Sequence, residues 1–406
     1  MVVSAALATA AAGSAQAQDL LALPGSPTAF GLNTLADMAV FAGVLFAASG
    51  LYLRDVGFAG AGAPGVAERY IAVIAVAVIL HWGVGYHLAH TDVSRFLGTP
   101  SPWLGADQSA IEGTRAEGGV FLRSAAFTLL ALLIATGGFG ARMRGAPVVI
   151  FAVIFATAVA PPVMAWIWGG GWLADLGARD AGGGAFHVAG GAAALAGMLV
   201  LRGAAVAPGE VEPSAGALGA LIAWAGLGAM AAFAGASFGD VDSADRFADA
   251  VVYTNLSAVG GAAGGAFFAR ATQLVRVDFG AVYGLIAGLA AIAWAPDSYT
   301  AQSAVIAGAI AGALATLAPA LLGWLRNIDP CGVVSAHLVG GAWGALAAGA
   351  LSQDFNLASQ AIAAGAIAAY AFAASLLVFL MLLFTIGLAS EQSNLEPDDD
   401  VDGETE

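Results

Sequence analysis

The sequence predicts an all-α, polytopic membrane protein. Of its 406 residues, 60% are hydrophobic and only 10% are charged, and the mean hydropathy is +0.84. Soluble domains carry about 25% charged residues. Apolar stretches long enough to cross a bilayer, about 20 residues each, recur along nearly the whole chain. Because these stretches are too long for strands of a membrane barrel, each is expected to be a helix whose backbone groups bond internally.

Eleven apolar stretches are separated by short polar breaks, and we number them as spans 1 to 11. They lie at residues 34–53, 69–89, 119–140, 146–168, 183–201, 215–237, 248–269, 279–296, 302–325, 331–351 and 358–388.

The basic residues indicate the orientation of the spans. All 13 of them are arginines. If the spans alternate in direction, eight arginines fall on one side: Arg54, Arg69, Arg142, Arg144, Arg202, Arg270, Arg276 and Arg326. The other five are Arg95, Arg115, Arg123, Arg179 and Arg246. The side richer in arginine is normally cytoplasmic, so we expect a multi-pass protein of the cell (inner) membrane, with its N-terminus outside and its C-terminus in the cytoplasm.

The two ends of the chain differ from the part between them. Residues 1–17 have an apolar core and a small-x-small ending at Ala15 and Ala17, which predicts a signal peptide cut near Gln18. Residues 390–406 form an acidic tail that accounts for part of the net charge of −15 and is typical of a solvated, flexible segment. Residues 18–389 are the predicted membrane domain.

Two spans carry the same motif around a histidine. Span 5 contains HVAGGAAALAG from His187, and span 10 contains HLVGGAWGALAAG from His337. Spans 1–5 (about 34–201) and 6–10 (about 215–351) are therefore predicted to be two repeats. An odd number of spans per repeat gives them opposite orientations, with the functional site between them at mid-membrane. Span 11 is then an addition, and the Gly-Gly pairs let helix backbones approach closely.

Ionisable residues within membrane spans are costly and usually line a pathway or face one another, so we expect His187 and His337 to share a central site. One imidazole nitrogen can donate a hydrogen bond while the other accepts one, which suits a proton or ammonium pathway. Two histidines without a nearby carboxylate or thiolate are a poor metal site, and the chain has one cysteine, Cys331. We expect no metal, no cofactor, no nucleic-acid partner and no enzyme chemistry.

The residues around these histidines resemble the Amt/Mep/Rh ammonium transporter family. The resemblance is carried by Trp168 to Gly197, WGGGWLADLGARDAGGGAFHVAGGAAALAG, and by Asp329 to Gly344, DPCGVVSAHLVGGAWG. ARMRG after span 3 and GLIAGLAAIAWAP in span 8 extend the likeness. It implies a homotrimer in which each subunit has its own hydrophobic pore, with His187 and His337 as the twin histidines of the lumen.

The resemblance also implies how the substrate enters. Ammonium is recruited at the outer mouth by aromatic rings and a hydroxyl, loses its proton and crosses as ammonia. Trp168 matches the tryptophan of that mouth, and Phe127 matches one ring of a phenylalanine gate. The other ring falls on Arg123, a cation at a cation-recruiting mouth, unless Arg123 turns to the interface or pairs with an acid.

Other positions match the family more loosely. Phe233 and Ser237 are the candidates in span 6 for a gate ring and the recruiting hydroxyl. Asp180 resembles an aspartate that braces the vestibule, and a role as a helix N-terminal cap is expected for it. His87 and His90 lie at the end of span 2, where we expect solvated imidazoles able to tune cation entry with pH.

Two alternatives to transport stay open. The same scaffold can serve as an ammonium sensor or receptor, and the same pore can pass another small neutral molecule, such as carbon dioxide or methylamine. In many family members the C-terminal tail meets a PII-type signalling protein. The tail of this chain keeps acidity and little else, which argues against that partner.

Overall fold

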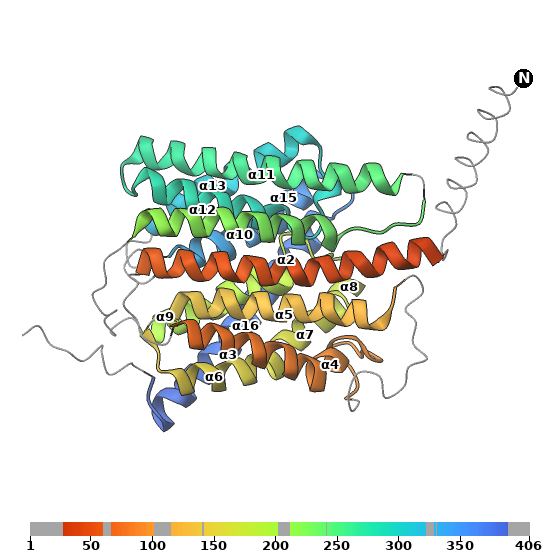
Figure 1. The fold of residues 1–406 in the computed structure, drawn as a ribbon, viewed down its shortest axis with the longest axis horizontal. Helices are drawn as coiled ribbons and strands as arrows, with labels where there is room; N and C mark the ends of the chain where they lie inside the picture. Colours follow the sequence, from red (N-terminus) through yellow and green to blue (C-terminus); the bar gives the residue numbers. More distant parts are fainter. Residues whose placement is uncertain are drawn as a thin grey trace, which may run out of the picture.

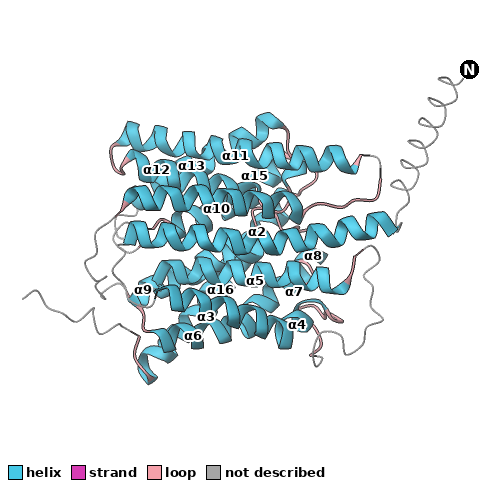
Figure 2. Ribbon diagram, in the orientation of Figure 1, coloured by secondary structure: helices cyan, strands magenta, loops and turns pink. Residues whose placement is uncertain are grey.

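The computed structural model describes residues 27–59, 66–100, 115–139, 142–201, 212–240, 242–321, 329 and 331–388. The expected signal peptide at 1–17 and the acidic tail at 390–406 lie outside these residues, as do Arg202 and Arg326. Helices and their connecting loops make up the described part of the chain (Figure 2).

The helices run back and forth along one direction and form a single bundle (Figure 1). The first repeat comprises α2 (Pro27–Ala59), α3–η1–α4 (Val66–Leu80, His81–Gly85, Tyr86–His90), α5 (Glu117–Phe139), α6–η3–α7–α8 (Gly145–Ile154, Phe155–Val159, Ala160–Ile167, Trp172–Asp175) and η4–α9 (Gly184–Val188, Ala189–Val200). The second comprises α10 (Pro213–Ala234), α11 (Ser243–Thr272), α12 (Val277–Ile292) with the short η5 (Pro296–Ser298), α13 (Ala301–Leu321) and η6–α15 (Val334–Val339, Gly340–Leu351). The last helix is α16 (Leu357–Thr385).

Within the described chain, eight helical segments are long and apolar enough to cross a membrane. Two shorter apolar helices, Gly184–Val200 and Val277–Ile292, and the more polar α11 bring the number to eleven. The predicted fold is therefore confirmed: eleven membrane helices in two inverted five-helix repeats, followed by α16. The last helix packs against α9 and α15, which carry the two histidine motifs.

Glycines join the first helices of the two repeats. Gly43, Gly50 and Gly57 recur every seventh residue of α2 and face the backbone of α10. A Cβ atom at Gly43 would lie only 2.9 Å from the carbonyl oxygen of Gly226. Small residues at such an interface allow backbones to approach closely in lipid, where no hydrophobic effect drives helices together.

Glycines also allow the two histidine segments to approach closely. His187 lies in the π-helical turn η4 and His337 in the π-helical turn η6, and each turn leads into a helix of 12 residues. Gly191, four residues after His187, faces Leu338, and Gly341, four residues after His337, faces Val188 and His187. The two contacts are equivalent under the pseudo-symmetry of the repeats, so each glycine makes room for the residues around the other repeat's histidine.

Two helices end earlier than their hydropathy predicted. α10 stops at Ala234, followed by Gly235, whereas span 6 was expected to reach residue 237, so Ser237 lies in a loop. α12 stops at Ile292, a few residues before Pro296, whose missing N–H cannot extend a helix. Trp294 lies in the resulting turn with a φ of 78°. These helix ends decide which side chains reach the site described below.

Replacing Gly191 with alanine is expected to destabilise the bundle by roughly 1–3 kcal/mol, the usual cost of overpacking. The new Cβ would lie 2.7 Å from both the backbone nitrogen and the Cβ of Leu338. Thermal unfolding of purified protein in detergent measures the change. Gly365→Ala on α16 is the matched control, because no atom lies within 4 Å of its Cβ position. Equal stability of the two variants would contradict the close contact of η4 with η6.

Candidate functional site

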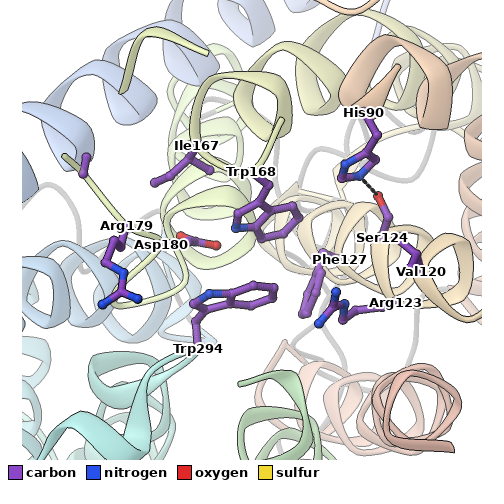
Figure 3. Close-up of a pocket in the computed structure, with 11 residues that line it drawn as sticks. His90, Val120, Arg123, Ser124, Phe127, Ile167, Trp168, Arg179, Asp180 and Trp294 are labelled. Carbon is purple, nitrogen blue, oxygen red and sulfur yellow. Dashed lines mark hydrogen bonds between the residues drawn. The ribbon is translucent and has the colours of Figure 1, made fainter. Parts of the chain in front are cut away.

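A cavity of about 330 Å³ opens at the end of the bundle where α4, α5 and α7 meet the turn that precedes η4. We call it the aromatic pocket. Of the residues predicted from the sequence, it is lined by His90, Arg123, Phe127, Trp168 and Asp180 (Figure 3). The structure adds Trp294, Ser124 and Arg179 to the lining.

Three aromatic rings form one wall of the pocket. The rings of Trp168 and Trp294 stack at a centroid distance of 4.7 Å, and Phe127 lies 5.0 Å from the first and 5.2 Å from the second (Figure 3). Ring faces of this kind attract cations. Sequence reasoning missed Trp294, although an aromatic residue two positions before Pro296, in a segment already noted for its resemblance to the family, was an available signal.

Aromatic rings lead from the pocket to the histidines. Phe127 stacks on Phe186 at 4.7 Å with an interplanar angle of 16°, and Phe186 lies 4.8 Å from the ring of His187. The predicted partner ring, Phe233, instead packs on Phe247 at 4.8 Å. The ring that stacks on Phe127 is that of Phe186, which lies between Phe127 and His187. Phe186 directly precedes His187 in the chain, and this was the only feature of the sequence that could have identified it.

His187 and His337 meet in the centre of the bundle. Their Nδ1 atoms are 3.0 Å apart, their ring centroids are 5.0 Å apart, and both side chains are fully buried. Because a neutral imidazole has one donor and one acceptor nitrogen, one ring must donate this hydrogen bond and the other must accept it. The alternation of donor and acceptor suits either a proton relay or the recognition of a small polar molecule.

Arg123 pairs with an acid, one of the two arrangements that the sequence left open. Its Nε lies 3.3 Å from Oδ1 of Asp37 on α2, and Nη1 of Arg115 lies 2.8 Å from the same oxygen. The Arg123 guanidinium also lies 5.7 Å from the ring centroid of Trp294. The Asp37 carboxylate thus pairs with both Arg115 and Arg123, and the Arg123 guanidinium also contacts the ring of Trp294. Asp37 was missed from the sequence, although it is the one acidic residue within span 1.

Asp180 stabilises the start of η4. Its Oδ1 accepts a hydrogen bond from the backbone N–H of Ala185 at 3.2 Å, while Oδ2 is buried without a hydrogen-bond partner among the described residues. Burial raises the pKa of Asp180 to about 7, although hydrogen bonds from the backbone of Ala185 and Gly184 act in the opposite direction.

The second repeat has an equivalent acid that sequence reasoning missed. Asp329 accepts from the N–H of Val333 at 2.7 Å through Oδ1, and from the N–H of Ser335 at 3.0 Å through Oδ2. Each acid is followed by a glycine in the left-handed region, Gly183 and Gly332, just before the histidine turn. Asp180 precedes His187 by seven residues and Asp329 precedes His337 by eight, so extending the repeat alignment upstream with a gap of one residue would have revealed the pair.

The expectation of solvated imidazoles at the end of span 2 is wrong for His87. His87 is only 8% exposed, and its Nδ1 lies 2.9 Å from Oγ1 of Thr91. The loop after α4 folds back over the helix end, with the N–H of Gly98 bonded to the carbonyl of Leu88, and covers this histidine.

His90 faces the pocket through a serine. Its Nε2 lies 2.8 Å from Oγ of Ser124, and the same hydroxyl lies 2.8 Å from Nε2 of the fully buried His81 (Figure 3 shows the first contact). Ser124 is thus a hydroxyl of the aromatic pocket. The predicted hydroxyl, Ser237, is exposed in the loop after α10 and does not border the pocket.

Comparison with known proteins identifies the family of the chain. A family model described as Ammonium Transporter Family matches residues 37–405. The chain belongs to this family. An ammonium transporter of Bacillus subtilis is 34% identical over 233 residues, which cover 55% of each chain. The ammonium transporter Amt1 of Archaeoglobus fulgidus is 30% identical over 298 residues, covering 71% of this chain and 72% of that protein.

Solved structures show the same fold. A structure titled Sensor Amt Protein superposes with a TM-score of 0.80 at 21% identity, covering 89% of this chain and 96% of that one. A Mep2 mutant from Candida albicans gives a TM-score of 0.77 at 26% identity, with 88% of both chains covered. The family consists of multi-pass membrane transporters rather than enzymes.

Asp37→Asn is expected to destabilise the protein by about 3–5 kcal/mol, because removing one partner leaves buried charges uncompensated. The Asp37 side chain is fully buried between Arg115 and Arg123. Asp240→Asn is the matched control: its partner Arg246 and Asp240 itself are about half exposed, and such surface pairs contribute at most about 1 kcal/mol. Chemical denaturation in detergent compares the two variants. A loss at Asp37 no larger than at Asp240 would contradict the paired arrangement of Arg123.

Proposed function

We propose that the protein transports ammonium across the cytoplasmic membrane, with His187 and His337 as the central relay of a hydrophobic pore. The observation that carries the proposal is the buried Nδ1–Nδ1 contact of 3.0 Å, reached from the aromatic pocket through Phe127 and Phe186. An apolar path cannot solvate potassium or sodium. Ammonium can leave its proton behind and cross as neutral ammonia.

The aromatic pocket is proposed to recruit the cation. Trp168 and Trp294 offer ring faces, and the unpartnered Oδ2 of Asp180 offers a hydrogen-bond acceptor. Arg123 competes for the same ring of Trp294, so recruitment has to work against one resident cation. Ser124 takes the role of pocket hydroxyl that the sequence assigned to Ser237.

We further propose the assembly and orientation that the family resemblance implies. Three copies form a homotrimer within the lipid bilayer of the inner membrane, with residues 18–389 as the transport domain and residues 390–406 as a cytoplasmic tail. The arginine distribution favours an orientation with the aromatic pocket on the outer side. Large apolar side chains such as Leu377 and Phe384 of α16, 68% and 82% exposed, are available to contact lipid or a second copy.

An ammonium sensor is the second candidate, and it has a structural observation in its favour. Arginines stand on both sides of the histidine pair: the partly exposed Arg123 at the pocket and the buried Arg54 beside His337. Two fixed cations along one path oppose the passage of ammonium beyond the aromatic pocket, which favours a protein that binds ammonium there without conducting it. A saturable ammonium response without flux in proteoliposomes would support the sensor, whereas flux would support transport.

Replacing both His187 and His337 with alanine is expected to abolish ammonium flux into proteoliposomes while a folded trimer remains. The substitutions remove both polar groups at the narrow centre of the path and leave no site to relay a proton or bind ammonia. His87→Ala, outside the pocket lining, is the control and should retain flux. Unchanged flux and ammonium selectivity in the double variant would reject the relay.

Ammonium binding should weaken as the pH falls through about 7. Asp180 is mostly ionised at pH 8 and mostly protonated at pH 6, because its pKa is raised to about 7, and only the ionised carboxylate attracts a cation. Calorimetry at the two pH values should show up to about a tenfold difference in affinity. Asp180→Asn should remove the dependence, whereas Asp329→Asn, at the equivalent turn of the second repeat, should preserve it. A pH dependence that survives in Asp180→Asn would contradict this role.

A further inference from the structure

Arg54 lies beside the histidine pair in the interior of the bundle. The orientation count assigned it to a polar break, but the structure places it within α2, with 1% of its surface exposed. Its Nη1 lies 3.4 Å from Nε2 of His337. An arginine buried in a membrane helix is costly and calls for a reason beyond packing.

The contact determines the protonation of both histidines. A guanidinium group can only donate hydrogen bonds, so Nε2 of His337 has to accept, and a neutral His337 carries its proton on Nδ1. That proton is donated to Nδ1 of His187, 3.0 Å away. His187 must then carry its own proton on Nε2. These tautomers follow from the hydrogen-bond network, as tautomers in proteins generally do.

The remaining nitrogen is available for a ligand. Nε2 of His187 is buried and has no hydrogen-bond partner among the described residues. Buried polar groups are nearly always paired, so an unpartnered buried N–H indicates where a small polar molecule can bind. The N–H of His187 can only donate there, and it requires a partner with a lone pair.

We propose that Arg54 fixes the tautomers of the histidine pair and thereby selects a neutral solute with a lone pair over a cation; this rests on the proposed transport function. Ammonia can accept a hydrogen bond from Nε2 of His187. Ammonium has no lone pair, so it finds no acceptor on that nitrogen. The guanidinium charge also disfavours a second proton on His337 and repels any cation that passes Phe186. Arg54 acts through the histidines, so it is a positioning residue.

The surroundings of Arg54 are built to hold it in place. Nε and Nη2 donate to Oδ1 of Asp55 at 2.9 and 2.7 Å, and Asp55 also accepts a hydrogen bond from the hydroxyl of Tyr70. Gly137 on α5 leaves room for this pair, since a Cβ there would lie 2.6 Å from Oδ2 of Asp55. The ion pair keeps the interior neutral overall while its positive end faces His337.

The test is solid-state NMR of the full-length protein in lipid bilayers with 15N-labelled histidine. His187 is the one histidine of the sequence that follows a phenylalanine, so carbonyl labelling of phenylalanine identifies it. We expect a protonated Nε2 on His187 and an unprotonated Nε2 on His337. The opposite tautomers in the unmodified protein would overturn the proposal, and this result needs no variant to fold.

Two variants test whether the tautomers depend on the hydrogen-bond donor at residue 54 or only on the packing of its side chain. The double variant Arg54→Met, Asp55→Asn removes the donor without leaving a buried charge, and the tautomer ratio of His337 should shift at least about tenfold. Arg54→Lys retains a charged donor opposite Asp55 and should keep the original tautomers. A folded double variant with unchanged tautomers would overturn the proposal, as would an Arg54→Lys protein with the tautomers of the double variant.

Flux measurements keep this inference distinct from the proposed function. In proteoliposomes, the double variant should show an ammonium-evoked current at least about tenfold above that of the unmodified protein, because the fixed positive charge beside the histidine pair is gone. Expected tautomers in an unmodified protein without flux would reject transport but support the role of Arg54. Flux with the opposite tautomers would support transport and reject the role of Arg54.

Discussion

The hydrogen bond between Nδ1 of His187 and Nδ1 of His337 joins the two repeats at the centre of the bundle. Each histidine is supplied by a different repeat, so the bond forms only if the repeats meet at one place and in one register. Gly191 and Gly341 permit the close approach of η4 and η6. The acids before the two turns stabilise their first N–H groups, so the histidines are held on equivalent, well-anchored segments.

Charge along the path follows a second constraint. A buried cation in a membrane protein needs a compensating acid, and both arginines near the path have one: Asp37 for Arg123 and Asp55 for Arg54. In each case the positive end of the pair faces the path, through Trp294 at the pocket and through His337 at the centre. The arrangement opposes passage of cations and leaves neutral molecules unaffected, which agrees with a pore that passes ammonia.

The sequence predicted what depends on composition and on the repeat. Hydropathy located the eleven helices, and the matched motifs identified His187 and His337 as partners, because both signals are local and need no knowledge of packing. The contacts that it missed depend on where helices end and how side chains pack. Ser237 lies in a loop because α10 stops at Ala234, and Trp294 reaches the pocket because α12 stops at Ile292. The contacts of Phe186 with Phe127 and of Arg54 with His337 join residues that are distant in sequence.

Flux through the unmodified protein decides whether the buried histidine pair passes ammonia and excludes cations, as we propose. A pH-sensitive dye inside proteoliposomes reports ammonia entry, and an inward ammonium gradient is compared with an equal potassium gradient, with protein-free liposomes as the background. We expect a fast internal pH change with ammonium and none with potassium. An ammonium response no faster than that of protein-free liposomes, or an equal response to potassium, would contradict the proposal.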